Sequence, residues 1–414
     1  MRPTQSLLDY LKIRASYGLV GSDMLPSDRF AYLAYYGGDN GYHFGPNLNS
    51  WIDGNGEARL ASTALTWEKA KKVNLGIDMT LFRQRLSISC DVFTEKRFDI
   101  LTNLNTSAGA DIQRMNFPGV VGASAPWINS SKIKNYGVDF EVTWQDKIGR
   151  DFRYFIKPNF TFARNKIEYT NEIDWGKNTW RQATGKPMNS NFTYVFDHFV
   201  ANQAEADALN ASGIQGSFGK LIPGDVVYKD MNGDKVIDDK DRAAQGYPRC
   251  PEIMFGIPMG FSYKGFDFSI LFQGATNSSI LLNGAAVYDF PNFHNDKMGK
   301  VKPMHLKRWT PETAENAKYP ALHLGTHNNN KNAHSSLFLY DASYVRLKNI
   351  EIGYSLPYQL IKVANLQQVR FYIQGQNLLT WDKLGDVDVD PETNSNGTWY
   401  PIQKVFNFGV NITF

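Results

Sequence analysis

Residues 230–241 carry the side chains of this sequence that are best spaced for chemistry. Six residues of this segment could offer an oxygen ligand at positions 1, 3, 5, 7, 9 and 12 of a twelve-residue loop: Asp230, Asn232, Asp234, Val236, Asp238 and Asp241. Five would use side-chain oxygens, and Val236 would use its backbone carbonyl. This is the spacing of an EF-hand-type calcium loop, so the sequence predicts a structural calcium site that stiffens the segment.

Other residues of the same region weaken this prediction. Lys235 stands where the sharp turn of an EF-hand loop prefers glycine, and Asp241 replaces the long bidentate glutamate. Pro248 and Pro251 follow closely and disfavour an exiting helix, so a complete helix-loop-helix calcium sensor is not expected. The alternative is a hydrated acidic turn without an ion, and the sequence leaves both open.

Motifs of catalysis are missing from the chain. There is no nucleophile elbow, HExxH sequence, Walker loop or glycine-rich dinucleotide fingerprint, and the seven histidines are scattered. Asp225 and Asp230 could in principle act as a glycosidase carboxylate pair, but the sequence does not give their separation. Cys90 and Cys250 predict two free thiols rather than a disulfide or a zinc site. We therefore expect a protein that is not an enzyme.

Composition narrows the class further. Phe and Tyr number 27 and 21 and Gly numbers 34, a mix that favours strands and turns. The formal net charge of +3, from 44 basic and 41 acidic residues, gives no electrostatic case for a nucleic-acid partner. No run of about 18 apolar residues occurs, which excludes an α-helical membrane span but leaves a transmembrane β-barrel open.

Alternation of apolar and polar residues is the strongest pattern in the chain. In the last segment one face carries Phe406, Phe408, Val410, Ile412 and Phe414. Residues 71–82 and 86–95 repeat the pattern on either side of Arg83-Gln84-Arg85, which predicts a β-hairpin with this tight turn. Further strands are expected near 11–19, 136–145, 152–166, 252–263, 266–276, 344–355 and 368–380.

The length of the ten expected strands and the alternation of short and long connections between them are typical of outer-membrane barrels. Each has roughly 9 to 15 residues, enough for a tilted strand to cross a bilayer. Short connections alternate with long ones, and such barrels have short turns on the periplasmic side and long loops outside. The short connections are 83–85, 146–151, 264–265 and 356–367, and the long ones are 20–70, 96–135, 167–251, 277–343 and 381–401. An even strand number brings both ends of the segment to the periplasmic side.

The predicted fold class is therefore all-β, an antiparallel transmembrane β-barrel. Its polar face would line a hydrated lumen and carries Asp78, Asp91, Asp139, Glu141, Glu351 and Arg370. Trp144 and Trp381 fall at strand ends, where amphipathic rings suit the membrane interfaces. The alternative is a soluble carbohydrate-binding β-sandwich, which shares the alternation but does not require the rhythm of loops. Its sugar-stacking aromatics would be loop residues such as Trp51, Trp175, Trp180, Trp309 and Trp399.

Seven short motifs, in order along the chain, resemble the SusC/RagA family of TonB-dependent outer-membrane transporters. They are LKIRASYG at 11–18, LTWEK at 65–69, NYGVDFE at 135–141, PGDVVY at 223–228, KGFDFS at 264–269, GQNLLT at 375–380 and the last strand ending in Phe414. The resemblance runs over essentially the whole length, and the order of the motifs makes the combination more specific than any one of them.

This resemblance implies a plugged barrel of roughly 22 strands in the outer membrane. It also implies a SusD-like surface lipoprotein as partner, drive from the TonB complex, and glycan or peptide fragments as substrates. Phe414 would be the terminal aromatic signal that the barrel-assembly machinery reads. Residues 1–414 would be the C-terminal portion of that barrel, about ten strands, with the plug, the signal peptide, the TonB-contacting segment and the N-terminal strands outside it. Such a segment alone would leave two unpaired edges in lipid, so it is not expected to transport by itself.

Overall fold

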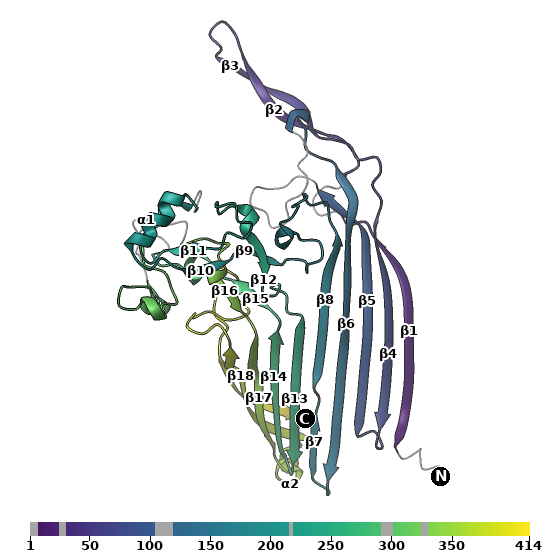
Figure 1. Ribbon diagram of the computed structural model, residues 1–414. Coiled ribbons are helices and arrows are strands. Elements are labelled where there is room, and N and C mark those ends of the chain that lie inside the picture. The colour runs from purple at the N-terminus through teal and green to yellow at the C-terminus, as the bar shows by residue number, and fades with distance from the viewer. Residues whose placement is uncertain (1–6, 25–29, 104–118, 215–217, 291–300, 324–329) are drawn as a thin grey trace.

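The computed structural model describes residues 7–24, 30–103, 119–214, 218–290, 301–323 and 330–414. Its main feature is an antiparallel sheet of eleven strands, which forms a tall curved wall in Figure 1. The strands pair in the order β1-β4-β5-β6-β7-β13-β14-β17-β18-β19, and β8 pairs with both β6 and β13. They are β1 Leu8–Ser22, β4 Glu68–Leu81, β5 Leu86–Asn103, β6 Trp127–Ile148, β7 Phe152–Ile156, β8 Asn159–Tyr169, β13 Ile253–Tyr263, β14 Phe266–Thr276, β17 Tyr344–Ser355, β18 Gln368–Asp382 and β19 Val405–Thr413.

The strand predicted at 152–166 is present as two strands, β7 and β8, that share one position in the wall. Both pair with β6 on one side and β13 on the other, and they are separated by Lys157 and Pro158. Pro158 has no N–H for the sheet, and its carbonyl accepts the N–H of Val142 at 3.0 Å. The wall therefore has ten strand positions, which confirms the predicted number.

The predicted alternation of short and long connections is confirmed. The short turns at 82–85, 149–151, 264–265 and 356–367 gather at the lower end of the wall in Figure 1, and the long connections lie at the upper end. In the first turn Phe82, Arg83 and Gln84 have φ of 57°, 59° and 65°, a left-handed run that reverses the chain tightly. β1 begins and β19 ends at the lower end, because Leu8 pairs with Leu81 and Thr413 with Gln368.

The two faces of the wall differ in polarity. On β1, Ile13 and Tyr17 are 68% and 72% exposed, and on β19, Phe408 is 76% exposed. A face covered with large exposed apolar side chains suits lipid rather than water. In the described residues β1 and β19 each pair with a single neighbour in the wall, so both edges of this sheet present unpaired backbone groups.

An arginine clasp crosses the polar face at β1, β4 and β5. The Arg14 guanidinium donates to Asp78 at 2.8 and 3.0 Å and to Asp91 at 2.9 and 2.7 Å. Gly76 lies beneath it, and a Cβ there would stand 2.7 Å from the Arg14 Cζ. The missing side chain lets Arg14 reach across the middle strand to a carboxylate two strands away.

A second arginine clasp crosses β14, β17 and β18. The Arg370 guanidinium pairs with Asp267 through two nitrogens and with Glu351 at 2.6 Å. Gly353 of the middle strand lies beneath it. Four of the six charged residues predicted to face the lumen belong to these clasps: Asp78, Asp91, Glu351 and Arg370. A fifth, Asp139, lies opposite Asp91 in the register of β5 and β6. Glu141, the sixth, pairs with Lys157 at 3.3 Å.

The two interface tryptophans lie at opposite ends of the wall, as predicted. Trp144 pairs in register with Leu86 beside a short turn, and its indole N–H donates to the Tyr154 hydroxyl at 3.2 Å. Trp381 pairs with Val345 at the end of β18. Amphipathic rings at both rims are what a membrane-spanning wall requires.

The described residues of the connections 170–252, 277–343 and 383–404 pack into one body, which we call the loop layer (Figure 1). Its largest buried cluster combines Leu282 and Val287 with Phe338 and Leu384, so at least two of the connections share a core. The layer's strands form three pairs, β9 with β12, β10 with β11, and β15 with β16. They are β9 Asn191–Tyr194, β10 Phe196–Phe199, β11 Val226–Tyr228, β12 Arg242–Gln245, β15 Ser279–Leu281 and β16 Leu339–Asp341.

The helices are short. They are α1 Gln203–Ser212, α2 Tyr358–Ile361 and the 3-10 helices η2 Gly119–Val121, η3 Thr179–Arg181, η5 Asp239–Asp241, η6 Gly284–Ala286, η8 Pro303–Lys307, η9 Ala314–Asn316, η10 Ser336–Phe338 and η11 Lys362–Ala364. Among the residues described, no helix has the length and apolar character needed to span a membrane.

The long connection 20–70 contains a hairpin that projects from the wall in Figure 1. Its strands are β2 Tyr35–Phe44 and β3 Ser50–Arg59. Two register shifts and several glycines interrupt the pairing, so the sequence shows no clean two-residue alternation there. Cys90 and Cys250 are both free thiols, as predicted.

Candidate functional site

The acidic segment 230–241 lies in the loop layer between β11 and β12. β11 is fully buried and pairs with β10, and β12 pairs with β9. The segment therefore leaves and re-enters well-packed strands, and its ends are held at a fixed separation. No exiting helix follows η5, because β12 begins at Arg242, as the nearby prolines predicted.

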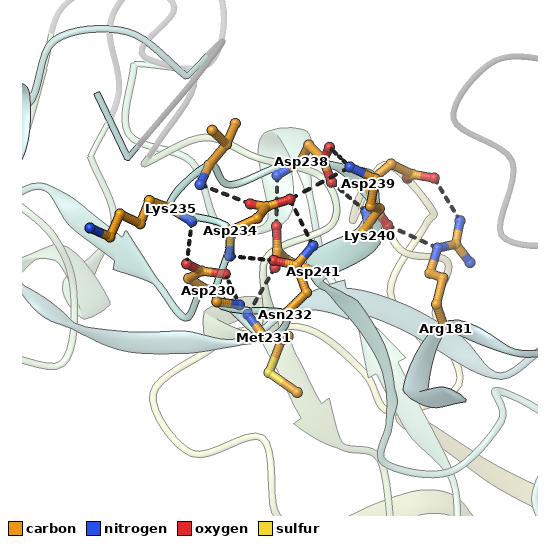
Figure 2. A network of polar contacts seen from close by, with 12 residues as sticks. Arg181, Asp230, Met231, Asn232, Asp234, Lys235, Asp238, Asp239, Lys240 and Asp241 are labelled. Atoms are coloured by element: carbon orange, nitrogen blue, oxygen red, sulfur yellow. Dashed lines mark hydrogen bonds and ion pairs between the residues drawn. The ribbon is translucent and has the colours of Figure 1, made fainter. Parts of the chain in front are cut away.

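The first half of the segment folds as a tight turn around Asp230 (Figure 2). The Asp230 carboxylate accepts the N–H groups of Gly233 at 2.7 Å and Lys235 at 2.8 Å. Lys235 has φ of 65°, so a lysine adopts the left-handed conformation that glycine usually supplies at this loop position. Asn232 and Asp234 accept the next N–H groups along the turn, at 2.9 and 3.0 Å.

Asp241 closes the segment from inside. Its side chain is fully buried and accepts the N–H groups of Met231 and Asp238, both at 2.8 Å (Figure 2). Burial raises the pKa of the Asp241 carboxyl and outweighs these two hydrogen bonds, which favour the charged form. Asp241, whose short side chain departs from the EF-hand pattern, thus holds the two ends of the turn together through buried hydrogen bonds.

A lysine supplies positive charge to the outer side of the turn. The Lys240 ammonium lies 3.0 Å from Asp238 and 3.6 Å from Asp234. The hydrogen bond to Asp238 raises the pKa of Lys240, and the hydrogen bond from Asn232 is the main cause that lowers the pKa of Asp234. Within the described ranges no group of three or more His, Cys, Asp or Glu side chains is arranged to hold a metal ion.

The structure therefore brings the six predicted residues into one compact turn. The five polar side chains among them already accept hydrogen bonds from N–H groups of the turn, and Asp234 and Asp238 also pair with the Lys240 ammonium. The Val236 N–H donates to Asp234 at 3.0 Å. A calcium ion would have to displace Lys240 and redirect several of these oxygens. Calcium binding stays a prediction, and its test is given in the Discussion.

Buried arginines anchor the segment to the rest of the loop layer, and no sequence motif predicts them. Arg181 is fully buried, contacts Asp239 at 3.0 Å through both its carbonyl and its carboxylate, and lies over the Trp175 ring at 4.7 Å. Arg242, 1% exposed, reaches the other Asp239 oxygen at 3.0 Å. Trp180 donates its indole N–H to the Lys240 carbonyl at 2.8 Å.

Asp225 is not part of a carboxylate pair with Asp230. It is fully buried and accepts hydrogen bonds from His323 at 2.7 Å and Asn330 at 3.0 Å. Asn330 in turn accepts the Val226 N–H at 2.9 Å. These contacts join the connection 170–252 to the connection 277–343, so Asp225 is a structural joint between two loops.

The tryptophans considered for sugar stacking divide into two groups. Trp309 is 8% exposed and packs against Gly224. The Trp175 ring contacts the Arg181 guanidinium, and the Trp180 indole N–H donates to the Lys240 carbonyl. Trp51 on the hairpin and Trp399 in the connection 383–404 are 52% and 68% exposed. Of these five tryptophans, the second group is the more exposed to a partner or a ligand.

Comparison with known proteins identifies the family. The family model described as "TonB dependent receptor-like, beta-barrel" matches residues 5–378. The chain belongs to the TonB-dependent receptor-like β-barrel family. This membership confirms the barrel fold class and the resemblance to SusC/RagA transporters, and it agrees with the absence of catalytic motifs because the relatives are receptors rather than enzymes.

The curated relatives are all longer TonB-dependent receptors. TonB-dependent receptor P3 of Formosa agariphila is 27% identical, and the match covers 97% of this chain and 39% of that protein. TonB-dependent receptor SusC of Bacteroides thetaiotaomicron is 25% identical, over 99% of this chain and 38% of SusC. This receptor chain thus spans about two-fifths of the length of the relatives it matches.

Solved structures show the same fold. The RagAB peptide transporter matches with a TM-score of 0.69 at 20% identity, over all of this chain and 42% of that one. The RagAB peptide importer in its "open-open" state matches with a TM-score of 0.72 at 21% identity, over 99% and 40%. These matches place the ten-position wall and the loop layer in a TonB-dependent receptor fold.

Proposed function

We propose that this chain is the C-terminal part of an outer-membrane TonB-dependent transporter that imports glycan or peptide fragments together with a SusD-like surface lipoprotein. The wall contributes ten strand positions to a larger plugged barrel, and the loop layer faces the outside of the cell. Family membership and the fold support the transporter class. The match to the RagAB peptide transporter supports peptides as one substrate class.

The observation that carries the proposal is the wall itself. It is tall, antiparallel and apolar on one face, and it has arginine clasps on the other. Its two edge strands, β1 and β19, each have one neighbour among the described residues. In hydrocarbon each unsatisfied backbone group costs several kcal/mol, so a membrane wall of this kind has to be closed by further strands. The TonB complex would act through the remaining part of the transporter.

The carbohydrate-binding sandwich is disfavoured by the same feature. A sandwich packs two large sheets about 10 Å apart over a shared core. In the part of the chain that the structure describes, every sheet other than the wall has two strands, and the apolar face of the wall is exposed. The exposed Trp51 and Trp399 would then contact substrate or the lipoprotein at the outer surface.

The proposal is tested in the native organism. Cells from which the gene has been deleted should lose growth on one class of glycan or peptide as sole nutrient and regain it on complementation. An antibody against residues 383–404 should detect the protein in the outer-membrane fraction and label intact cells. Growth of the deletion strain on every glycan and peptide source, or recovery of the protein in the soluble fraction, would contradict the proposal.

A further inference from the structure

A cavity of about 260 Å³ lies on the polar face of the wall, where the wall meets the loop layer. Met254 of β13 and Gln273 of β14 line it from the wall, and Tyr344 lines it from the start of β17. Gln273 is six residues from Asp267 in a strand that pairs with β13 without a register shift, so both side chains point to the same face. The cavity is therefore on the lumen side, at the end where the long connections gather.

Arg249 brings a cation to this cavity from the connection before β13. Among the described residues its guanidinium makes one hydrogen bond, to the Thr393 carbonyl at 2.6 Å, and no ion pair. Burial is the main influence on Arg249 and lowers its pKa, and the carboxylates of Glu392 and Asp390 offset this only in part. The cation is thus partly desolvated and has N–H donors left to offer.

The neighbouring carboxylates already have a partner. Arg346, 1% exposed, donates to Asp390 and to Glu392, each at 2.6 Å. Glu392 lines the cavity beside Arg249, and its carboxylate also accepts a hydrogen bond from the Tyr344 hydroxyl. An added anion would therefore bind to Arg249 and not to Arg346.

The walls of the cavity are fixed before any ligand arrives. The Ser278 hydroxyl donates to the Arg249 carbonyl at 2.8 Å. The Glu392 N–H donates to Asp390 at 2.9 Å, and the Ala342 N–H donates to the Ser278 carbonyl at 2.9 Å. Groups held in this way lose little freedom on binding, which favours affinity.

We propose that this cavity, the carboxylate pocket, binds a carboxylate group of the imported substrate through the guanidinium of Arg249. Guanidinium and carboxylate match in geometry and form charge-assisted hydrogen bonds. Gln273 adds a neutral hydrogen-bonding group, and Met254 adds an apolar contact. The volume lies below the roughly 300–1,000 Å³ of pockets that enclose a whole small ligand, so the cavity takes one end group.

The inference rests on the proposed transport function and narrows its substrate. A carboxylate can come from the C-terminus of a peptide or from a uronic acid unit of a glycan. The chemistry at Arg249 is the same for both sources, and the experiment separates them.

The test uses the receptor purified from the outer membrane of its host and four probes. These are a random tetrapeptide pool, the same pool amidated at its C-termini, oligogalacturonides, and the methyl esters of those oligogalacturonides. Retained molecules are quantified by mass spectrometry. We expect retention of one acid probe at least tenfold above its neutral counterpart, the size of effect that a charge-assisted hydrogen bond gives. The Arg249→Gln variant should lose this preference, and Arg249→Lys should keep part of it.

Arg308→Gln is the matched control, because Arg308 is a half-buried arginine of the loop layer that does not line the cavity. It should bind as the wild-type receptor does. Circular dichroism and thermal unfolding should be the same for all variants. Equal retention of acid and neutral probes by the wild type, retention of neither acid probe, or an unchanged preference in Arg249→Gln would each overturn the carboxylate pocket. The growth test of the transporter proposal does not depend on Arg249, so the two can fail separately.

Discussion

Replacing Gly353 by alanine should break the second arginine clasp. Gly353 lies in β17 beneath the Arg370 guanidinium, and an alanine Cβ would stand 2.6 Å from the Arg370 Cζ and from its Nε. Real Cβ atoms essentially never come so close to another heavy atom. The guanidinium would have to leave its position, and its hydrogen bonds to Asp267 and Glu351 would be lost or lengthened.

The expected loss of stability follows from these contacts. A hydrogen bond to a charged group contributes about 1.5–3 kcal/mol when well shielded, and the clasp faces a hydrated lumen, so we take about 2 kcal/mol for the whole clasp. Alanine in a strand interior regains about 0.5–1 kcal/mol relative to glycine. The net effect of Gly353→Ala should therefore be a loss of about 1–1.5 kcal/mol in the free energy of unfolding.

The assay is urea-induced unfolding of the native receptor in detergent micelles, followed by tryptophan fluorescence. Gly18→Ala is the control, because Gly18 lies in β1 with nothing within 4 Å of its added Cβ, and it should be neutral or slightly stabilising. In an Arg370→Gln background Gly353→Ala should no longer destabilise, which gives a coupling energy of about 2 kcal/mol. An equal loss for Gly353→Ala with and without Arg370, or a loss no larger than that of Gly18→Ala, would refute the reasoning.

Two further predictions concern the loop layer. If the acidic segment binds calcium, isothermal titration of the native receptor should show a site with a Kd of about 10⁻⁴–10⁻³ M that Asp230→Ala removes; no calcium binding by the wild type would end that prediction. Burial lowers the pKa of His198, but its hydrogen bonds to Asp197 and Glu205 prevail and raise it above the ordinary value of 6.5. The stabilisation from protonated His198 should therefore be complete below about pH 6.5 and be lost as pH rises through the raised pKa. Hydrogen exchange in α1 should show this step, and His198→Gln should abolish it.

The arrangement of the wall could be predicted from the sequence. Strand positions follow from the two-residue alternation, as in Phe406 to Phe414, because each strand separates lipid from a hydrated face. The orientation of the wall follows from the lengths of its connections. The compact turn at 230–241 could also be expected, because Asp and Asn side chains compete for backbone N–H groups within a few residues. These features depend on residues that are close together in the chain.

The irregular features could not be predicted in the same way. The hairpin β2–β3 lacks clean alternation, and the alternation predicts one continuous strand across the break at Pro158. Both depend on how the backbone hydrogen bonds are satisfied by neighbouring segments.

Only the tertiary structure decides which charged side chains meet. Arg370 reaches Asp267 because the register puts Gly353 between them, and Arg249 shares a cavity with Glu392 because the connection 383–404 folds back over the wall. Such pairs join residues more than a hundred positions apart, and a shift of one residue in the register would move each strand's partners to the opposite face. The sequence by itself therefore determines a membrane wall with long outer loops. The clasps, the buried arginines of the loop layer and the carboxylate pocket are set by long-range packing, because their partners come together only once the strands are in register.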